Sequence, residues 1–255
     1  METNYNLIAY NLDKAAANAQ AIPQVSIKSP FNLKEAYGIQ SIVMSKRYLR
    51  GYKNVGLKLG FTSKAKMEQM GVHDMIWGRL TEDMTYANGG SLKKNKFIHP
   101  RAEPEIAFLV KKNINDIITK DDFEDYISSV CVAIEIIDSR YENFKFSLED
   151  VVADNCSSAA YCLGDWKDFS TNINDIKINL SVDGKVVQEG NSTAILGNPY
   201  KSLTAISRLA LDNGIEIGEG DIILAGAATP AIYIESEQTI SANADGLGDV
   251  VLKVE

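Results

Sequence analysis

The chain has 255 residues, of which 45% are apolar and 24% are charged, with a formal net charge of −8. This composition is typical of a globular protein with one large domain, or of a domain with a short N-terminal extension. The acidic balance argues against nucleic acid as the main partner, and no run of about 18 apolar residues predicts a membrane span. Three cysteines without a metal-binding spacing, together with an N-terminus unlike a signal peptide, predict a cytoplasmic protein with free thiols.

The N-terminal part of the chain predicts helices. Residues 3–20 are rich in alanine, and a second helix is expected to open at Ser29-Pro30 and to end at Gly51, with apolar residues recurring at helical spacing between them. The pattern changes after this glycine. Residues 55–62 alternate and are rich in glycine, which predicts a strand that another backbone approaches closely.

The remainder of the chain predicts mainly short strands. A helix is expected at residues 63–70, another at 121–129, and a third from Asn198-Pro199 to just before Gly214. Asp183-Gly184 between two alternating runs indicates a β-hairpin. Strands are expected near residues 103–111, 131–138, 159–164, 176–182, 221–226, 230–235, 238–241 and 248–254. We therefore predict an α+β protein with a helical segment at residues 1–52 and a mixed, mainly β domain at residues 53–255.

Three carboxylates in two of these strands suggest a metal site. Glu103 and Glu105 are two residues apart, so both side chains point to the same face of a strand. Glu135 lies inside an apolar run, where a buried carboxylate is costly unless a positive charge compensates it. No histidine or cysteine stands next to them in sequence. A hard cation that prefers oxygen ligands, Mg²⁺ or Mn²⁺, is therefore expected.

Simpler interpretations of the same residues remain open at this point. Glu103 and Glu105 fit a solvent-facing pair on an edge strand, which the intervening proline would suit. Glu135 could form an internal ion pair with Arg140 or Arg101. Asp138 could orient a metal ligand or Arg140, or form a structural salt bridge. His99 is expected to be a loop residue.

A series of ordered motifs extends over residues 30–255. It comprises Lys58-Leu59-Gly60-Phe61-Thr62, Met70-Gly71-Val72, Ile76-Trp77-Gly78, Glu103-Pro104-Glu105-Ile106-Ala107, residues 135–145, Val152-Ala153-Asp154-Asn155-Cys156-Ser157-Ser158 and Ala194-Ile195-Leu196-Gly197-Asn198-Pro199. This series resembles the hydratase/decarboxylase family of catechol meta-cleavage pathways, within the fumarylacetoacetase superfamily. Its members take part in the catabolism of aromatic compounds and include 2-oxopent-4-enoate hydratase and 4-oxalocrotonate decarboxylase.

The resemblance implies a mixed β-roll core with an Mg²⁺ or Mn²⁺ ion and a 2-oxo acid substrate. By position, Glu103, Glu105 and Glu135 correspond to the metal ligands and Lys58 to the active-site lysine, although a lone lysine on an alternating strand is usually a surface residue. Ser157 and Ser158 correspond to polar groups near the substrate, although an ordinary polar turn is the simpler interpretation. Three further residues are expected in the substrate pocket: Ile76, Trp77 and Thr229. A homo-oligomer, and a complex with a paralogous hydratase or decarboxylase, are also implied.

One position bears on which reaction the chain catalyses. Hydratases of the family tend to carry Asp where this chain has Ile76, and decarboxylases tend to carry an apolar residue. Hydration needs a base that activates water, which isoleucine cannot supply. The expected activity is therefore decarboxylation of 2-oxo-3-hexenedioate, with hydration of 2-hydroxypenta-2,4-dienoate as the alternative. A non-catalytic oxo-acid binding protein and a different superfamily reaction, such as C–C bond hydrolysis or oxaloacetate decarboxylation, are the other classes considered.

Overall fold

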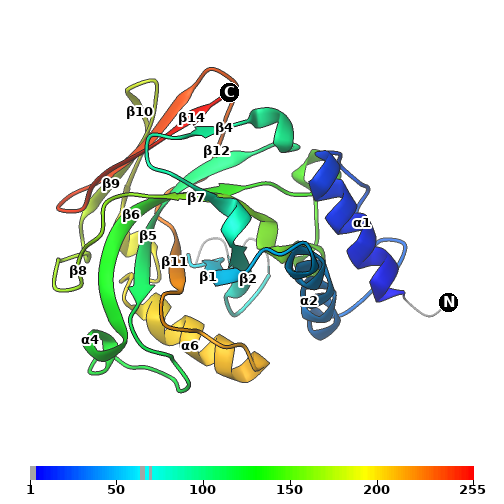
Figure 1. The fold of residues 1–255 in the computed structure, drawn as a ribbon, viewed down its shortest axis with the longest axis horizontal. Coiled ribbons are helices and arrows are strands. Elements are labelled where there is room, and N and C mark those ends of the chain that lie inside the picture. Colours follow the sequence, from blue (N-terminus) through cyan, green and yellow to red (C-terminus); the bar gives the residue numbers. More distant parts are fainter. Residues whose placement is uncertain (1–3, 64–66, 69–70) are drawn as a thin grey trace.

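The computed structural model describes residues 4–63, 67–68 and 71–255 and contains two curved sheets flanked by helices (Figure 1). The larger sheet contains β1 (Asn54–Gly60), β2 (Ile76–Thr81), β3 (Thr85–Tyr86), β5 (Arg101–Val110), β6 (Ile127–Ile137), β7 (Ser158–Leu163), β8 (Lys167–Asp168), β11 (Ile222–Ala227) and β12 (Ile232–Tyr233). Its strand order is β2-β1-β11-β5-β6-β7-β3, with β12 beside β5 and β8 beside β6.

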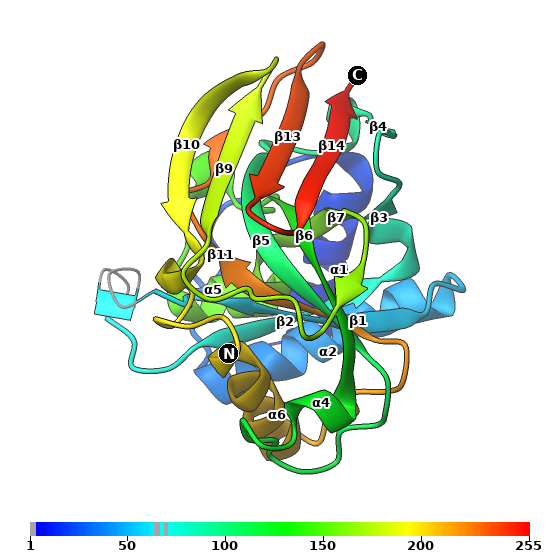
Figure 2. The same ribbon diagram turned by 90° about the vertical axis from the view of Figure 1, so that its left-hand side faces the viewer.

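The smaller sheet has the order β10-β9-β13-β14-β4 and stands against one face of the larger one (Figure 2). Its strands are β4 (Ser91–Leu92), β9 (Lys177–Val182), β10 (Lys185–Asn191), β13 (Thr239–Ala244) and β14 (Gly248–Val254). The helices are α1 (Tyr5–Asn18), α2 (Leu33–Leu49), α4 (Phe123–Tyr126), α5 (Leu148–Ala153) and α6 (Lys201–Asn213). None of the helices in the described residues combines the length and apolar character needed to cross a bilayer.

The antiparallel pair β5–β6 is the centre of the fold, and both of its faces are buried. Val130, Val132 and Ile134 belong to the main apolar core, toward the smaller sheet. The alternate residues Cys131 and Ala133 belong to a separate apolar cluster on the other face. Burial of both faces explains why the sequence of β6 is an almost continuous apolar run. The sheets and helices together confirm the predicted α+β architecture.

The two N-terminal helices pack on each other, and α2 also packs against α5. Their apolar residues share one cluster with Ile76 and Tyr141 of the β-rich part. Helix α2 begins three residues later than the Ser29-Pro30 pair predicts, because Asn32 and Glu35 form a reciprocal capping box around its first turn. The boundary near residue 52 between a helical segment and a β domain stays a prediction.

Several expected elements differ from the observed ones. The helix expected at 121–129 is wrong beyond α4, because Ile127 already pairs with Val110 at the start of β6. Helix α6 begins at Lys201 instead of at the Asn198-Pro199 pair, although it ends before Gly214 as predicted. The sequence pattern did not predict β2. The helix expected at 63–70 falls partly on residues 64–66 and 69–70, which lie outside the described residues.

The predicted hairpin at Asp183-Gly184 is confirmed. These residues join β9 to β10, and both have a positive φ, at 50° and 77°. This is the backbone conformation that a two-residue turn of type I′ requires.

Gly56 permits the close approach of β1 to β11. Its φ is +149°, and a Cβ atom placed there would lie 1.9 Å from the backbone oxygen of Ile222. Because a backbone atom cannot move aside, we expect Gly56→Ala to lower the free energy of unfolding by about 2 to 4 kcal/mol. Gly38→Ala is the matched control in helix α2, where the new methyl group meets nothing within 4 Å. It should raise the free energy of unfolding by about 0.5 to 1 kcal/mol. Urea denaturation measures both values, and equal effects would contradict this account.

Candidate metal centre and substrate cavity

The three carboxylates predicted as metal ligands converge in the structure. Glu103 and Glu135 are direct partners across β5 and β6, and Glu105 lies two residues along on the same face. One carboxylate oxygen from each residue lies within 4.8 Å of the others, and all three side chains are buried. The alternative of a solvent-facing pair at a sheet edge is wrong, because β5 lies between β11 and β6.

Strand β11 fixes the position of Glu105. The backbone N–H of Gly226 donates a hydrogen bond of 2.8 Å to Glu105 Oε2. Gly226 has a φ of +109°, and a Cβ atom there would overlap the side chain of Thr62 at 2.2 Å. A side chain at this position would therefore push apart the two segments that border the carboxylates.

Lys58 completes the charged cluster from strand β1. Its Nζ lies 3.0 Å from Glu135 Oε2, and the residue is only 3% exposed. The alternative ion pairs for Glu135 are not formed: Arg140 pairs with Asp154, and the Arg101 guanidinium lies between the rings of Phe144 and Tyr233. The usual surface role of a lysine on an alternating strand is likewise wrong here.

The electrostatics of this cluster favour a bound cation. Burial, reinforced by the neighbouring carboxylates, raises the pKa of Glu105, and burial also raises the pKa of Glu135. Burial disfavours the ammonium form of Lys58, but the carboxylates, Glu135 foremost, outweigh burial and raise its pKa. Three ionised carboxylates against one ammonium group leave an excess negative charge in a buried site.

Orphaned oxygen atoms point to the same conclusion. Glu105 Oε1 and Glu135 Oε1 are buried without a hydrogen-bond partner in the described part of the chain. Buried carboxylate oxygens are costly unless a donor or a cation satisfies them. An all-oxygen donor set fits Mg²⁺ or Mn²⁺, so these residues suit the divalent ion that the sequence predicts.

A cavity of about 380 Å³ opens beside the cluster. Lys58, Glu103 and Ser157 contribute polar groups to its wall, and Ile76 and Thr229 also line it. The rest of its wall is mostly apolar and includes Ile137, Phe144, Phe146, Val151 and Pro230. The sequence analysis did not place Phe144 or Phe146 in the pocket. For Phe144 the backbone has a positive φ of 56°, a conformation that no local sequence pattern predicts.

Two predicted site residues lie elsewhere. Trp77 is a core residue whose ring stacks on Tyr37 at 4.9 Å and lies under the guanidinium of Arg79. Its side chain points away from the cavity because Ile76, its neighbour in β2, points toward it. The hydroxyl of Ser158 faces Met84 Sδ at 3.8 Å, on the far side of the turn from the cavity. Of the Ser157–Ser158 pair, the cavity therefore receives only Ser157.

Asp138 is hydrogen-bonded to the loop that contains His99. The Asp138 carboxylate accepts hydrogen bonds of 2.8 Å from the backbone N–H groups of Ile98 and His99, so it fixes the loop that leads into β5. Within the described residues its carboxylate forms no salt bridge, which was one of the alternatives considered from sequence. Arg140 contacts only the backbone oxygen of Asp138, while its guanidinium pairs with Asp154.

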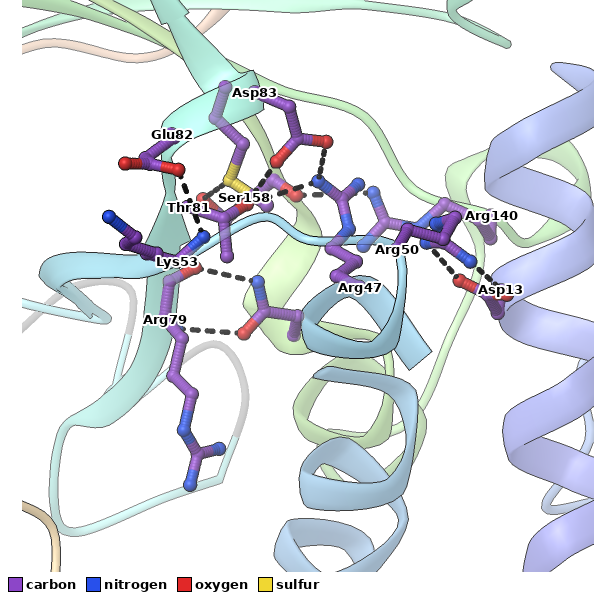
Figure 3. A network of polar contacts seen from close by, with 12 residues as sticks. Asp13, Arg47, Arg50, Lys53, Arg79, Thr81, Glu82, Asp83, Arg140 and Ser158 are labelled. Carbon is purple, nitrogen blue, oxygen red and sulfur yellow. Dashed lines mark hydrogen bonds and ion pairs between the residues drawn. The ribbon is translucent and has the colours of Figure 1, made fainter. Parts of the chain in front are cut away.

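A polar network connects helices α1 and α2 to the turn after β2 (Figure 3). Arg50, the C-cap residue of α2, forms paired hydrogen bonds of 2.8 Å with Asp13 of α1, and Arg47 reaches Asp83 at 2.8 Å in the turn after β2. Arg140 enters the same region from the loop after β6. These ion pairs attach the two helices to each other and to the edge of the larger sheet.

Comparisons with known proteins assign the chain to a family. The family model described as "Fumarylacetoacetate (FAA) hydrolase C-terminal" matches residues 63–255. The chain belongs to the FAA hydrolase family. The carboxylates of the centre lie inside the matched range, whereas Lys58 lies just before it.

Individual relatives of this FAA hydrolase family member carry two kinds of name. A 4-oxalocrotonate decarboxylase from Pseudomonas sp. is 43% identical over 95% of both chains. A 2-keto-4-pentenoate hydratase from Burkholderia vietnamiensis is 34% identical over 84% of this chain and 83% of its own. The solved 4-oxalocrotonate decarboxylase from Pseudomonas putida G7, complexed with magnesium and adipate, superposes with a TM-score of 0.93 at 32% identity, covering 98% of this chain and 97% of that one.

Proposed function

We propose that this protein is a carboxy-lyase that converts 2-oxo-3-hexenedioate (4-oxalocrotonate) to 2-hydroxypenta-2,4-dienoate and CO₂ with Mg²⁺, or Mn²⁺, as cofactor. The observation that carries the proposal is the convergence of Glu103, Glu105 and Glu135 with Lys58 beside a largely apolar cavity. The full-length similarity to 4-oxalocrotonate decarboxylases supports it.

The substrate is a vinylogous β-keto acid. When the bond between C5 and the distal carboxylate breaks, its electron pair moves through the double bond into the 2-oxo oxygen, which then takes up a proton. Glu103, Glu105 and Glu135 would hold the divalent ion, which would supply a Lewis acid for that oxygen. Lys58 lines the cavity with its Nζ 3.0 Å from Glu135 Oε2, where an ammonium group can bind the proximal carboxylate or deliver the proton.

The apolar wall has a separate task. Phe144, Phe146 and Val151 line the cavity together with Ile76 and exclude water from it. Apolar surroundings destabilise the charged carboxylate of the substrate because they do not solvate it. They do not destabilise neutral CO₂, so these residues favour the release of CO₂. Without water beside it, the dienolate is also less prone to hydration.

Ile76 is the residue at which decarboxylation and hydration diverge. Ile76→Asp would place a base in the cavity, so we expect a lower rate of CO₂ release and a higher rate of dienoate hydration, with the ratio of the two rates changing by at least about 10-fold. Ile76→Val is the matched control, which keeps the wall apolar and should leave the ratio unchanged. An unchanged ratio in the aspartate variant would reject this residue as the switch.

The direct test uses both substrates. Purified protein with Mg²⁺ is incubated with 2-oxo-3-hexenedioate and, separately, with 2-hydroxypenta-2,4-dienoate. We expect CO₂ release from the first and little loss of dienoate absorbance from the second. The reverse result would favour hydration, the activity named for the relative from Burkholderia vietnamiensis. Repeating the assay with Mn²⁺ identifies the preferred ion.

We further propose a cytoplasmic location, a homo-oligomeric state, and association with a paralogous hydratase or decarboxylase that consumes or supplies the dienoate. Light scattering of the purified protein, alone and mixed with such a paralogue, measures the assembly. A single species at about 28.0 kDa in both samples would reject these assemblies.

A further inference from the structure

The turn that carries Ser157 has an unusual backbone. Asn155, Cys156 and Ser157 have φ values of 49°, 53° and 58°, so three successive residues with side chains occupy the left-handed region. Residues other than glycine rarely adopt this conformation, and it persists only where surrounding contacts hold it. The turn joins α5 to β7 and borders the cavity through Cys156 and Ser157.

The side chain of Asn155 supplies such contacts. Its Oδ1 accepts a hydrogen bond of 2.8 Å from the backbone N–H of Arg79, and its Nδ2 donates one of 2.9 Å to the backbone oxygen of the same residue. The amide thus pairs with the outer edge of β2 as a neighbouring strand would. At Gly78 a Cβ atom would lie 2.7 Å from the Asn155 backbone oxygen, so the turn and the strand fit closely together.

Strand β2 in turn pairs with β1, the strand that carries Lys58. Gly78 is the partner of Lys58 across β1 and β2. The turn held by Asn155 therefore has a fixed position relative to Lys58. Cys156 reinforces the contact, because its Sγ lies 3.0 Å from the backbone oxygen of Trp77.

Ser157 carries an unused polar group at this position. The residue is 3% exposed, lines the cavity, and its Oγ has no hydrogen-bond partner among the described residues. The backbone oxygen of Ser157 accepts a hydrogen bond of 2.8 Å from the backbone N–H of Asp138, so the residue cannot rotate away from the cavity without breaking it. A buried hydroxyl without a protein partner is available to a ligand.

We propose that Asn155 is a positioning residue: by holding the left-handed turn against β2, it directs the Ser157 hydroxyl into the cavity to donate a hydrogen bond to the carboxylate of the 2-oxo acid. This inference rests on the proposed function for the identity of the ligand. Asn155 itself acts only through the turn and touches no substrate.

The test is a double-mutant cycle with Asn155→Ala, Ser157→Ala and the double variant, assayed with Mg²⁺ and 2-oxo-3-hexenedioate. A hydrogen bond to a charged group predicts that each single variant loses about 10- to 100-fold in kcat/KM. The double variant should lose no more than about 3-fold beyond Ser157→Ala, because both changes remove the same contact. Losses that multiply would overturn the proposal.

Two further variants separate the effect of the Asn155–Arg79 hydrogen bonds from the effects of backbone strain and of general stability. Asn155→Gly relieves the positive φ but lacks the amide, so it should remain as impaired as Asn155→Ala; wild-type activity would show that backbone conformation alone suffices. Asn32→Ala removes the cap of α2 at an exposed residue that does not line the cavity, and it should lower the melting temperature with unchanged kcat/KM. If Asn155→Ala does not fold, Asn155→Asp keeps the acceptor for Arg79 and should show a partial loss.

A binding measurement keeps this inference distinct from the proposed function. Calorimetric titration with oxalate in the presence of Mg²⁺ probes the same carboxylate contact without turnover. Asn155→Ala and Ser157→Ala should weaken oxalate binding by similar factors, and Asn32→Ala should not. If the wild-type protein releases no CO₂, the proposed function fails, and the oxalate result still decides whether Asn155 positions Ser157. Wild-type oxalate affinity in Asn155→Ala would overturn the positioning role.

Discussion

Glu105→Gln is expected to abolish metal binding and nearly all activity. The glutamine keeps the volume of the side chain and can still accept the hydrogen bond from Gly226, but it removes one of three negative charges from a buried site. A metal ion contributes several kcal/mol of charge stabilisation in the transition state, so a loss of about 4 kcal/mol lowers kcat/KM by about 10³-fold. Calorimetric titration with Mg²⁺ and the CO₂ assay measure the two effects.

The matched control for this change is Glu219→Gln, at an exposed position far along the chain from the metal strands. It should bind Mg²⁺ and release CO₂ like the wild type. Because Glu105 is buried beside two other carboxylates, removing its charge should also stabilise the protein in the presence of a chelator. Undiminished Mg²⁺ affinity in Glu105→Gln would remove Glu105 from the ligand set.

Lys58→Met is expected to lower kcat/KM by about 10²- to 10⁴-fold, the range of a positioned acid–base group. Mg²⁺ binding should persist, because all three carboxylates remain. Methionine has nearly the same length as lysine and no charge, so it can occupy the buried position beside Glu135. The variant therefore removes the ammonium group with little change in volume. The loss should appear in kcat, measured by CO₂ release, with Mg²⁺ affinity as the independent readout.

Two comparison variants define the role of this lysine. Lys58→Arg keeps a positive charge but cannot give up its proton, so activity should stay low if Lys58 moves a proton. Full activity in the arginine variant would reduce Lys58 to an electrostatic role. Lys177→Met changes an exposed lysine of β9 that pairs with Glu189 on the surface, and it should leave activity unchanged.

The metal site was predictable from local sequence to a large extent. A period of two places Glu103 and Glu105 on one face of a strand, and an acid inside the apolar run of β6 marks Glu135 as a residue that needs compensation. The role of Lys58 came only from the resemblance, since an alternating strand by itself predicts a surface lysine. Ile76 and Thr229 were expected in the pocket and line the cavity, whereas Trp77 and Ser158 do not.

The sequence by itself determined which residues form the central strands, which acids share a face, and which kind of cation suits them, because these properties depend on neighbours along the chain. Only the tertiary structure decided that Lys58 reaches Glu135, that Gly226 binds Glu105, and that Asn155 holds the turn at Ser157. Each of these contacts joins segments dozens of residues apart. The order of strands β1, β11, β5 and β6 sets the first two, and the third depends on the edge position of β2. Strand order follows from the packing of the whole core, and local periodicity does not predict it.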